Sequence, residues 1–195
     1  FFAVVVAGLV ALMGCNTAKT AKSSEPVQDT SWMFSQIVDA DFVAEHVNVP
    51  MDKSVMIIDA RPYKPKYIKG HIPGAVSIPF TQFDTHIDKL PADKSALLIY
   101  YCGGLKCKLS HKSAYKAQAL GYPNVKVYAN GYPDWISRKG NYSSVSVEHV
   151  AAQLASNKTL IVDARPQKTK FVKGHIPSAI NIPFSQFDAL SGKLP

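Results

Sequence analysis

The sequence lacks several features that mark common classes of protein. Its 22 Lys and Arg residues are scattered, with no basic helix and no basic stripe interleaved with aromatic residues, which argues against nucleic-acid binding. No cluster of His and Cys residues has the spacing of zinc ligands, so we expect no metal site. The uncharged run 1–13 is too short to cross a bilayer as a permanent helix.

Acidic residues are also few. With 14 Asp and Glu residues the net charge is +8, and such a surface attracts small anions, acidic partners and membrane headgroups. The apolar content of 47% and the charged content of 18% are typical of a globular protein and not of a disordered one.

The N-terminal segment has the apolar core of a secretion signal. It ends in Leu12-Met13-Gly14-Cys15, which resembles a bacterial lipobox, so we expect residues 1–15 to be a lipoprotein-type signal that leads to lipidation of Cys15. An ordinary cleaved signal and a buried apolar segment are the alternatives. The sequence has no initiator Met and no basic n-region, so we expect it to begin partway through this signal.

The expected lipid anchor places the protein in a bacterial cell envelope, facing the periplasm and attached to a membrane. Asn16 after the Cys favours the outer membrane, by analogy with enteric bacteria. Residues 16–33 are mostly small and polar and predict a flexible linker.

An internal repeat predicts the domain organisation. Residues 55–91 and 159–195 align without gaps at an offset of 104, with 22 of 37 positions identical. A period near one hundred residues is the size of a domain, so we predict one domain over 34–142 and a second over 143–195. The second copy ends at the counterpart of Pro91, so we expect it to be incomplete and without a counterpart of Cys102.

Strand-like and helix-like segments alternate along the chain. Short apolar segments predict strands at 55–60, 75–78, 96–101 and 125–128, and helices are predicted at 66–69, 80–87, 107–120, 132–138 and 147–155. This alternation predicts an α/β domain with layers around a mostly parallel central sheet.

A cysteine stands where a predicted strand meets a predicted helix. Cys102 follows the strand 96–101, and the ligand crevice of an open α/β sheet lies at the carboxyl ends of its strands. Gly103 and Gly104 let a short loop curl so that its N–H groups point inward, and such a loop before a helix favours anions. The same field stabilises a thiolate, and Lys106 and Lys108 add positive charge nearby.

Four runs occur in the order found in the rhodanese family. They are Asp59-Ala60-Arg61-Pro62, Gly70-His71-Ile72-Pro73-Gly74-Ala75, the loop that starts at Cys102, and Gly131-Tyr132-Pro133-Asp134-Trp135. Together they make residues 34–142 resemble one rhodanese domain and 145–195 part of another. The resemblance implies a three-layer rhodanese-like fold followed by a truncated second copy. It also implies a sulfurtransferase.

The resemblance assigns roles to residues of this sequence. Cys102 would be the nucleophile that takes sulfur from a small anionic donor, thiosulfate or polysulfide, and passes it to a thiol or cyanide acceptor. The substrate-binding loop would be Gly103, Gly104, Leu105, Lys106 and Cys107. Persulfide chemistry needs only the thiolate, so we expect no cofactor.

Other residues of the resemblance are expected to be structural. Asp59 and Arg61 would form an ion pair that holds loops together, and His71 would be a hydrogen-bonding core residue and not a base. Asp163, Arg165 and His175 would repeat these roles in the second copy. We expect His111 to lie on the surface.

Two points stay open at this level. Cys107 closes the loop where related proteins have Ser, Thr or Arg, and it is either a small buried residue or a resolving thiol that forms a disulfide with Cys102. A six-residue loop without Arg argues against phosphate-ester chemistry, because the phosphatase and arsenate-reducing relatives have a seven-residue loop closed by Arg. A non-catalytic rhodanese module used for binding, and a thiol redox protein that uses Cys102 and Cys107, remain alternatives to the sulfurtransferase.

Overall fold

The computed structural model describes residues 29–156 and 158–194. The expected signal with its Cys15, and residues 16–28 of the expected linker, lie outside the described residues. Helices and strands alternate as the sequence predicts, with α-helices, strands and short 3₁₀ helices in this order: β1 (Ile37–Val38), α1 (Ala40–Glu45), β2 (Val55–Asp59), a 3₁₀ helix (Tyr67–Lys69), β3 (Val76–Ser77), two 3₁₀ helices (Phe80–Thr85 and Ile87–Lys89), β4 (Leu97–Tyr101), α2 (Leu109–Ala119), β5 (Val125–Tyr128), α3 (Gly131–Ser137), α4 (Val147–Ser156), β6 (Val162–Asp163), a 3₁₀ helix (Phe171–Lys173), β7 (Ile180–Asn181), a 3₁₀ helix (Phe184–Gln186), α5 (Phe187–Leu190) and a 3₁₀ helix (Ser191–Lys193).

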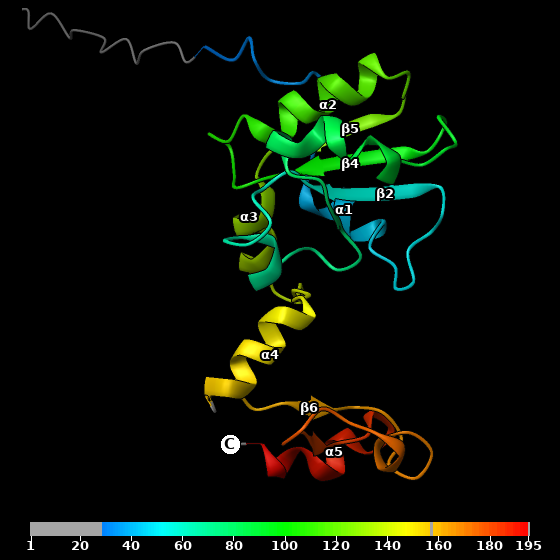
Figure 1. Ribbon diagram of the computed structural model, residues 1–195, viewed down its shortest axis with the longest axis vertical. Helices are drawn as coiled ribbons and strands as arrows, with labels where there is room; N and C mark the ends of the chain where they lie inside the picture. The colour runs from blue at the N-terminus through cyan, green and yellow to red at the C-terminus, as the bar shows by residue number, and fades with distance from the viewer. Residues whose placement is uncertain (1–28, 157, 195) are drawn as a thin grey trace, which may run out of the picture. The chain divides into compact units, whose positions relative to one another are not determined.

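Within the described residues, the first domain is built on a sheet of five strands in the order β1-β5-β4-β2-β3 (Figure 1). All four strand pairings are parallel. The prediction of an α/β fold with a mostly parallel central sheet is therefore confirmed. β4 lies in the middle of this sheet, paired with β2 on one side and β5 on the other, so the residue that follows it lies over the centre of the domain.

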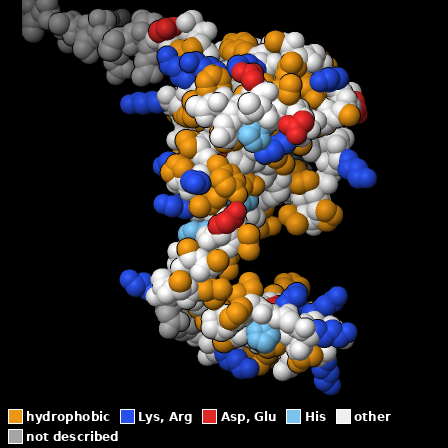
Figure 2. All heavy atoms as spheres, viewed as in Figure 1, with side chains coloured by type: hydrophobic (Ala, Val, Ile, Leu, Met, Phe, Trp, Pro, Cys, Tyr) orange, Lys and Arg blue, Asp and Glu red, His pale blue; other side chains and the backbone are white. Residues whose placement is uncertain are grey.

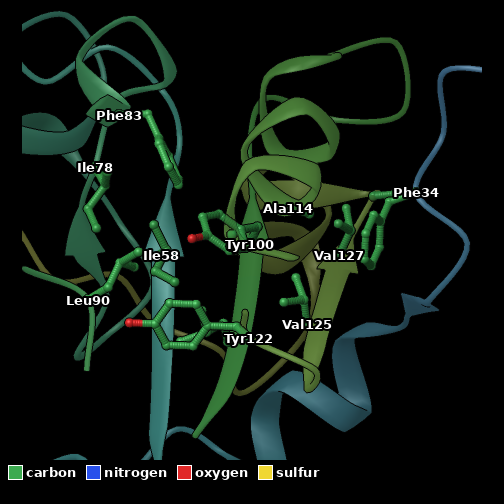
Figure 3. Close-up of a cluster of buried hydrophobic side chains, with 13 residues drawn as sticks. Phe34, Ile58, Ile78, Phe83, Leu90, Tyr100, Ala114, Tyr122, Val125 and Val127 are labelled. Atoms are coloured by element: carbon green, nitrogen blue, oxygen red, sulfur yellow. The ribbon is translucent and has the colours of Figure 1, made fainter. Parts of the chain in front are cut away.

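The central strands are apolar on both faces because helices cover both. Side chains alternate along β4, so that Leu98 and Tyr100 join the core on the α2 side while Ile99 and Tyr101 join the core on the side of α1 and α3. Figure 3 shows side chains from three adjacent strands gathered on the α2 side of the sheet (Ile58, Tyr100 and Val127). The result is the three-layer arrangement that the alternating pattern predicts.

Helix α2 begins two residues later than predicted. The backbone N–H of Cys107 donates to the carbonyl of Gly104 at 2.8 Å, which makes residues 104–107 a turn. The helix begins only at Leu109, so Cys107 belongs to the loop.

The expectation that His111 lies on the surface is wrong. His111 is fully buried, its Nδ1 accepts a hydrogen bond from the N–H of Phe34 at 3.0 Å, and the ring of Trp32 meets its ring edge-on at 4.9 Å. The residues that cover it come from the segment before β1, about 80 positions earlier in the chain. A helix considered alone does not reveal this contact.

The second repeat forms a small parallel pair of strands, β6 and β7, over the described residues 158–194. Before it, α4 begins after Ser146, whose Oγ accepts from the N–H of His149 at 3.4 Å and so caps the helix. Among residues 29–156 and 158–194, no helix has the length and apolarity needed to cross a bilayer. The boundaries of the two domains stay predictions.

Candidate active site

The loop after β4 lies at the carboxyl end of the central strand. It runs from Cys102 to Lys108, and Gly104 adopts a φ of +114°, a conformation that residues with a side chain rarely adopt. The turn between Gly104 and Cys107 reverses the chain inside this loop. The two cysteines therefore lie at the start and near the end of one curled segment, as the glycine pair predicts.

The start of α3 supports the loop from behind. The N–H of Tyr132 donates to the carbonyl of Cys102 at 3.0 Å, and Gly131 adopts a φ of +64°. A Cβ at Gly131 would lie 2.3 Å from that carbonyl oxygen, so only glycine fits here. In the sequence, Gly131 was noted only as part of a run that resembles the family. A glycine next to the start of a predicted helix is the signal that could have indicated this close approach.

Cys102 is completely buried. Its thiol donates to the carbonyl of Cys107 at 3.2 Å and accepts from the Oγ of Ser110, also at 3.2 Å. The hydrogen bond with Cys107 and burial raise the pKa of Cys102 well above its ordinary value. This differs from the expectation that the loop would stabilise a thiolate on Cys102. Ser110, in the first turn of α2, is a contact that the sequence analysis missed.

Cys107 carries the lowered pKa instead. A hydrogen bond from the Cys102 thiol, the N–H groups of Gly103 and Leu109, and the positive charge of Arg61 lower the pKa of Cys107 to about 6. The inward-pointing amides that the glycines predict therefore exist, but they point at the second cysteine. Both cysteines are free thiols, and Cys107 is half-buried.

Cys107 faces a cavity of about 400 Å³. Arg61, Lys66 and Lys69 line this cavity, and no carboxylate of the described residues does. These cations come from the segment that follows β2 and not from the loop itself. The sequence analysis missed Lys69, and the cluster of lysines after Pro62 was the signal that could have found it.

The lysines of the loop do not line this cavity. Lys106 and the largely exposed Leu105 line a second, open hollow, together with Cys107, Asn130 and Asp134. Lys108 points to the ring of Trp32, with its Nζ 5.0 Å from the ring centre. The loop cations expected to assist Cys102 are thus not gathered around it. Figure 2 likewise shows Lys and Arg side chains spread over the viewed face.

Asp59 and Arg61 form a buried ion pair at the end of β2. The guanidinium reaches both oxygens of the carboxylate, with a shortest distance of 2.5 Å, and also donates to the carbonyl of Gly70 at 2.7 Å. The hydroxyl of Tyr101 donates to the same carboxylate at 2.8 Å, and the Tyr132 ring lies 4.1 Å below the guanidinium. The pair therefore joins β2, β4, α3 and the cavity wall. This geometry agrees with the loop-holding role that the resemblance implies.

His71 is also held in place by local contacts. Its Nδ1 bonds the carbonyl of Tyr67 at 2.9 Å and its ring stacks on the Tyr67 ring at 3.9 Å. Burial lowers the pKa of His71, which favours the neutral ring. Within the described ranges, no group of three His, Cys, Asp or Glu side chains could hold a metal ion.

The second copy repeats these local arrangements. Arg165 reaches Asp163 at 2.5 Å and the carbonyl of Gly174 at 2.8 Å, and His175 stacks on Phe171 at 3.8 Å. The side chain of Arg165 is 51% exposed, whereas that of Arg61 is 6% exposed.

Comparison with known proteins identifies the family. A family model described as "Rhodanese-like domain" matches residues 43–138 and 146–194. The chain belongs to the rhodanese-like domain family. Rhodanese-like relatives include the 3-mercaptopyruvate sulfurtransferase of Escherichia coli K12, which is 25% identical over 214 residues that cover 80% of this chain and 73% of that protein. A putative thiosulfate sulfurtransferase of Synechococcus elongatus is 27% identical over 224 residues, covering 94% of this chain and 67% of that protein.

Two solved structures are also similar to parts of this chain. The rhodanese-like domain of the Alr3790 protein from Anabaena sp. is 22% identical, with a TM-score of 0.47 over 60% of this chain and 83% of that one. The BH2092 protein of Bacillus halodurans is 26% identical, with a TM-score of 0.48 over 57% of this chain and 77% of that one.

Proposed function

We propose that the chain is a sulfurtransferase that moves sulfane sulfur from thiosulfate or polysulfide to a thiol or cyanide acceptor through a persulfide on Cys102. One observation carries the proposal. The loop holds two thiols, and the Cys102 thiol donates to the backbone carbonyl of Cys107, which lies beside a cavity that three cations line and no carboxylate of the described residues lines. Such a cavity attracts a small anionic donor to a nucleophilic sulfur.

In the first step, the Cys102 thiol turns away from the carbonyl of Cys107 and gives its proton to the Cys107 thiolate. Ser110 then stabilises the Cys102 thiolate through its hydroxyl, which already donates to this sulfur. The thiolate attacks the sulfane sulfur of thiosulfate, the sulfur–sulfur bond of the donor breaks, and sulfite leaves with the electron pair. Arg61, Lys66 and Lys69 stabilise the negative charge on the leaving group.

In the second step, an acceptor thiolate or cyanide attacks the outer sulfur of the persulfide. The sulfur–sulfur bond breaks and Cys102 recovers its thiolate. Every electron pair moves between sulfur atoms and the acceptor, so no cofactor enters this scheme.

The test measures sulfite released from thiosulfate under anaerobic conditions. We expect one sulfite per chain in the first turnover and none from Cys102→Ala. The Cys107→Ser variant should gain the mass of one sulfur atom on the peptide that contains Cys102. The proposed reaction would be refuted if thiosulfate gave neither sulfite nor the sulfur adduct and polysulfide also gave no adduct.

The donor is tested in the same assay. The relative from E. coli is named for 3-mercaptopyruvate, which is also an anion and would suit a cationic cavity. A kcat/KM for 3-mercaptopyruvate far above that for thiosulfate and polysulfide would keep the sulfurtransferase and replace the donor.

A thiol redox protein is the second candidate function, because two free thiols lie in one curled loop and the Cys102 thiol donates to the carbonyl of Cys107. Formation of a Cys102–Cys107 disulfide by an oxidant, combined with no sulfur uptake from any donor, would favour that function.

Attachment to a bacterial membrane through lipid on Cys15, facing the periplasm, belongs to the same proposal. The apolar run that ends in Gly14-Cys15 supports it. Metabolic labelling with a fatty acid in a bacterial host tests the anchor, with Cys15→Ser as the control that should carry no label.

A further inference from the structure

The two loop cysteines differ in their access to the cavity. Cys102 is completely buried and is bonded on both sides, to Cys107 and to Ser110. Cys107 is half-buried and its residue lines the cavity beside Arg61. Any persulfide on Cys102 therefore forms in the same curled loop as a second, more accessible cysteine.

The backbone holds this second sulfur in place. The turn from Gly104 to Cys107 folds the end of the loop back toward its start, and the Cys102 thiol already touches the carbonyl of Cys107 at 3.2 Å. The N–H groups of Gly103 and Leu109 point at the Cys107 sulfur, and Arg61 adds positive charge. These groups stabilise a thiolate, which is the form of cysteine that attacks another sulfur.

We propose that Cys107 discharges the Cys102 persulfide, releasing hydrosulfide and leaving a Cys102–Cys107 disulfide that a dithiol reductant then opens. The inference rests on the proposed function, because it needs the persulfide. It adds a product, hydrosulfide, and a partner class, a dithiol, to the site.

The discharge step balances. The Cys107 thiolate attacks the inner sulfur of the Cys102 persulfide, the bond to the outer sulfur breaks, and the outer sulfur leaves with the electron pair as hydrosulfide. The sulfane sulfur is reduced by two electrons, and the two cysteine thiols are oxidised to a disulfide.

The reductant completes the cycle by thiol–disulfide exchange. Its first thiolate attacks the sulfur of Cys107, because Cys107 is the more exposed of the two cysteines and lines the cavity. Cys102 leaves, and the second thiolate of the reductant attacks the mixed disulfide and frees Cys107. With thiosulfate as donor, the sum is thiosulfate and a dithiol giving sulfite, hydrosulfide and an oxidised dithiol.

The test uses the full chain with Cys15→Ser, so that only the two loop cysteines remain. The reduced protein is freed of reductant anaerobically and given one equivalent of thiosulfate. We expect one sulfite and one hydrosulfide per chain, and a protein mass lower by two hydrogen atoms. Addition of dithiothreitol should restore both thiols and allow a second release.

Cys107→Ser in the same background is the matched variant. Without the Cys107 thiolate to accept its proton, Cys102 should react more slowly with thiosulfate. After a full equivalent of sulfite has been released, the variant should still keep the sulfur atom as a stable adduct and should have released at least tenfold less hydrosulfide per sulfite. If it takes up sulfur while the protein with both cysteines also keeps the adduct and releases no hydrosulfide, the discharge step is overturned and the sulfurtransferase stands. If neither protein takes up sulfur, the proposed function itself fails.

Discussion

The contact between Gly131 and the cysteine loop leads to a quantitative prediction for Gly131→Ala. Gly131 opens α3 with a φ of +64°, and an added Cβ would lie 2.3 Å from the carbonyl oxygen of Cys102 and 2.9 Å from the backbone nitrogen of Gly104. Both atoms belong to the backbone of the loop. The loop must therefore move away from α3, which breaks the 3.0 Å hydrogen bond between Tyr132 and Cys102.

Two costs add in this variant. A residue with a side chain in the left-handed conformation costs about 1–2 kcal/mol, and an overpacked contact costs about 1–3 kcal/mol. The free energy of unfolding should fall by about 2–5 kcal/mol, which lowers the Tm of a domain of this size by roughly 8–20 °C. A loop displaced by about 1 Å should also slow persulfide formation by about tenfold or more.

Gly140→Ala is the matched control. Gly140 has a φ of +92°, but nothing lies within 4 Å of its added Cβ, so only the conformational cost of about 1–2 kcal/mol applies. Thermal unfolding followed by circular dichroism and sulfite release from thiosulfate measure the two effects. Equal losses of Tm in both variants, or persulfide formation at the wild-type rate in Gly131→Ala, would refute the role of the close approach.

Three further predictions concern charged and titratable groups. Asp59→Asn should lower the free energy of unfolding by about 3–5 kcal/mol, because it leaves the buried Arg61 guanidinium without its carboxylate. Asp163→Asn should lower the free energy of unfolding less, because water reaches Arg165. Urea unfolding measures both changes. The rate at which iodoacetamide alkylates Cys107 should increase as pH rises through about 6. Cys102→Ala should move the pH midpoint of this increase upward, because the Cys102 thiol is the strongest cause of the low pKa of Cys107. Peptide mass spectrometry measures the extent of alkylation. Burial lowers the pKa of His111 in the folded state. The neutral ring therefore contributes to stability above the ordinary histidine pKa of about 6.5, and this contribution is lost as pH falls below that value. The Tm of the wild type should fall more steeply with acid than the Tm of His111→Gln.

Strands β2, β4 and β5 could be predicted closely from the sequence because their signal is local, whereas the two-residue strand β1 was not predicted. Segments β2, β4 and β5 are short apolar runs, and each begins and ends within one residue of the predicted range. The start of α2 could not be predicted as well, because a hydrogen bond inside the loop competes with the first turn of the helix. Burial of His111 depends on residues that lie about 80 positions earlier.

The candidate site could also be predicted only in part. The sequence predicts a cysteine loop at the end of a buried strand, and the structure has Cys102 at the carboxyl end of the central strand. Which of the two cysteines carries the negative charge depends on where the N–H groups of Gly103 and Leu109 point. The loop that carries these groups is supported by Gly131, which lies about thirty positions later in the chain.

Comparison of the two copies of the repeat shows that the motif itself determines the local side-chain geometry. The ion pair of Asp59 and Arg61 and that of Asp163 and Arg165 have the same shortest distance, 2.5 Å, although one guanidinium is buried and the other is half exposed. The ring stacking of His71 and of His175 also agrees within 0.1 Å. These arrangements are therefore local products of about fifteen residues.

Burial, in contrast, comes from β4, α2 and α3, whose residues lie outside the repeated segment 55–91. The thiols, the serine that bonds Cys102 and the glycine that supports the loop all lie in that outside part, between positions 102 and 131. The repeated motif thus supplies a cationic wall, Arg61 with its fixed partner, and the following forty residues supply the reactive sulfur. Substitutions in the second copy of the motif should accordingly leave the chemistry at Cys102 and Cys107 unchanged.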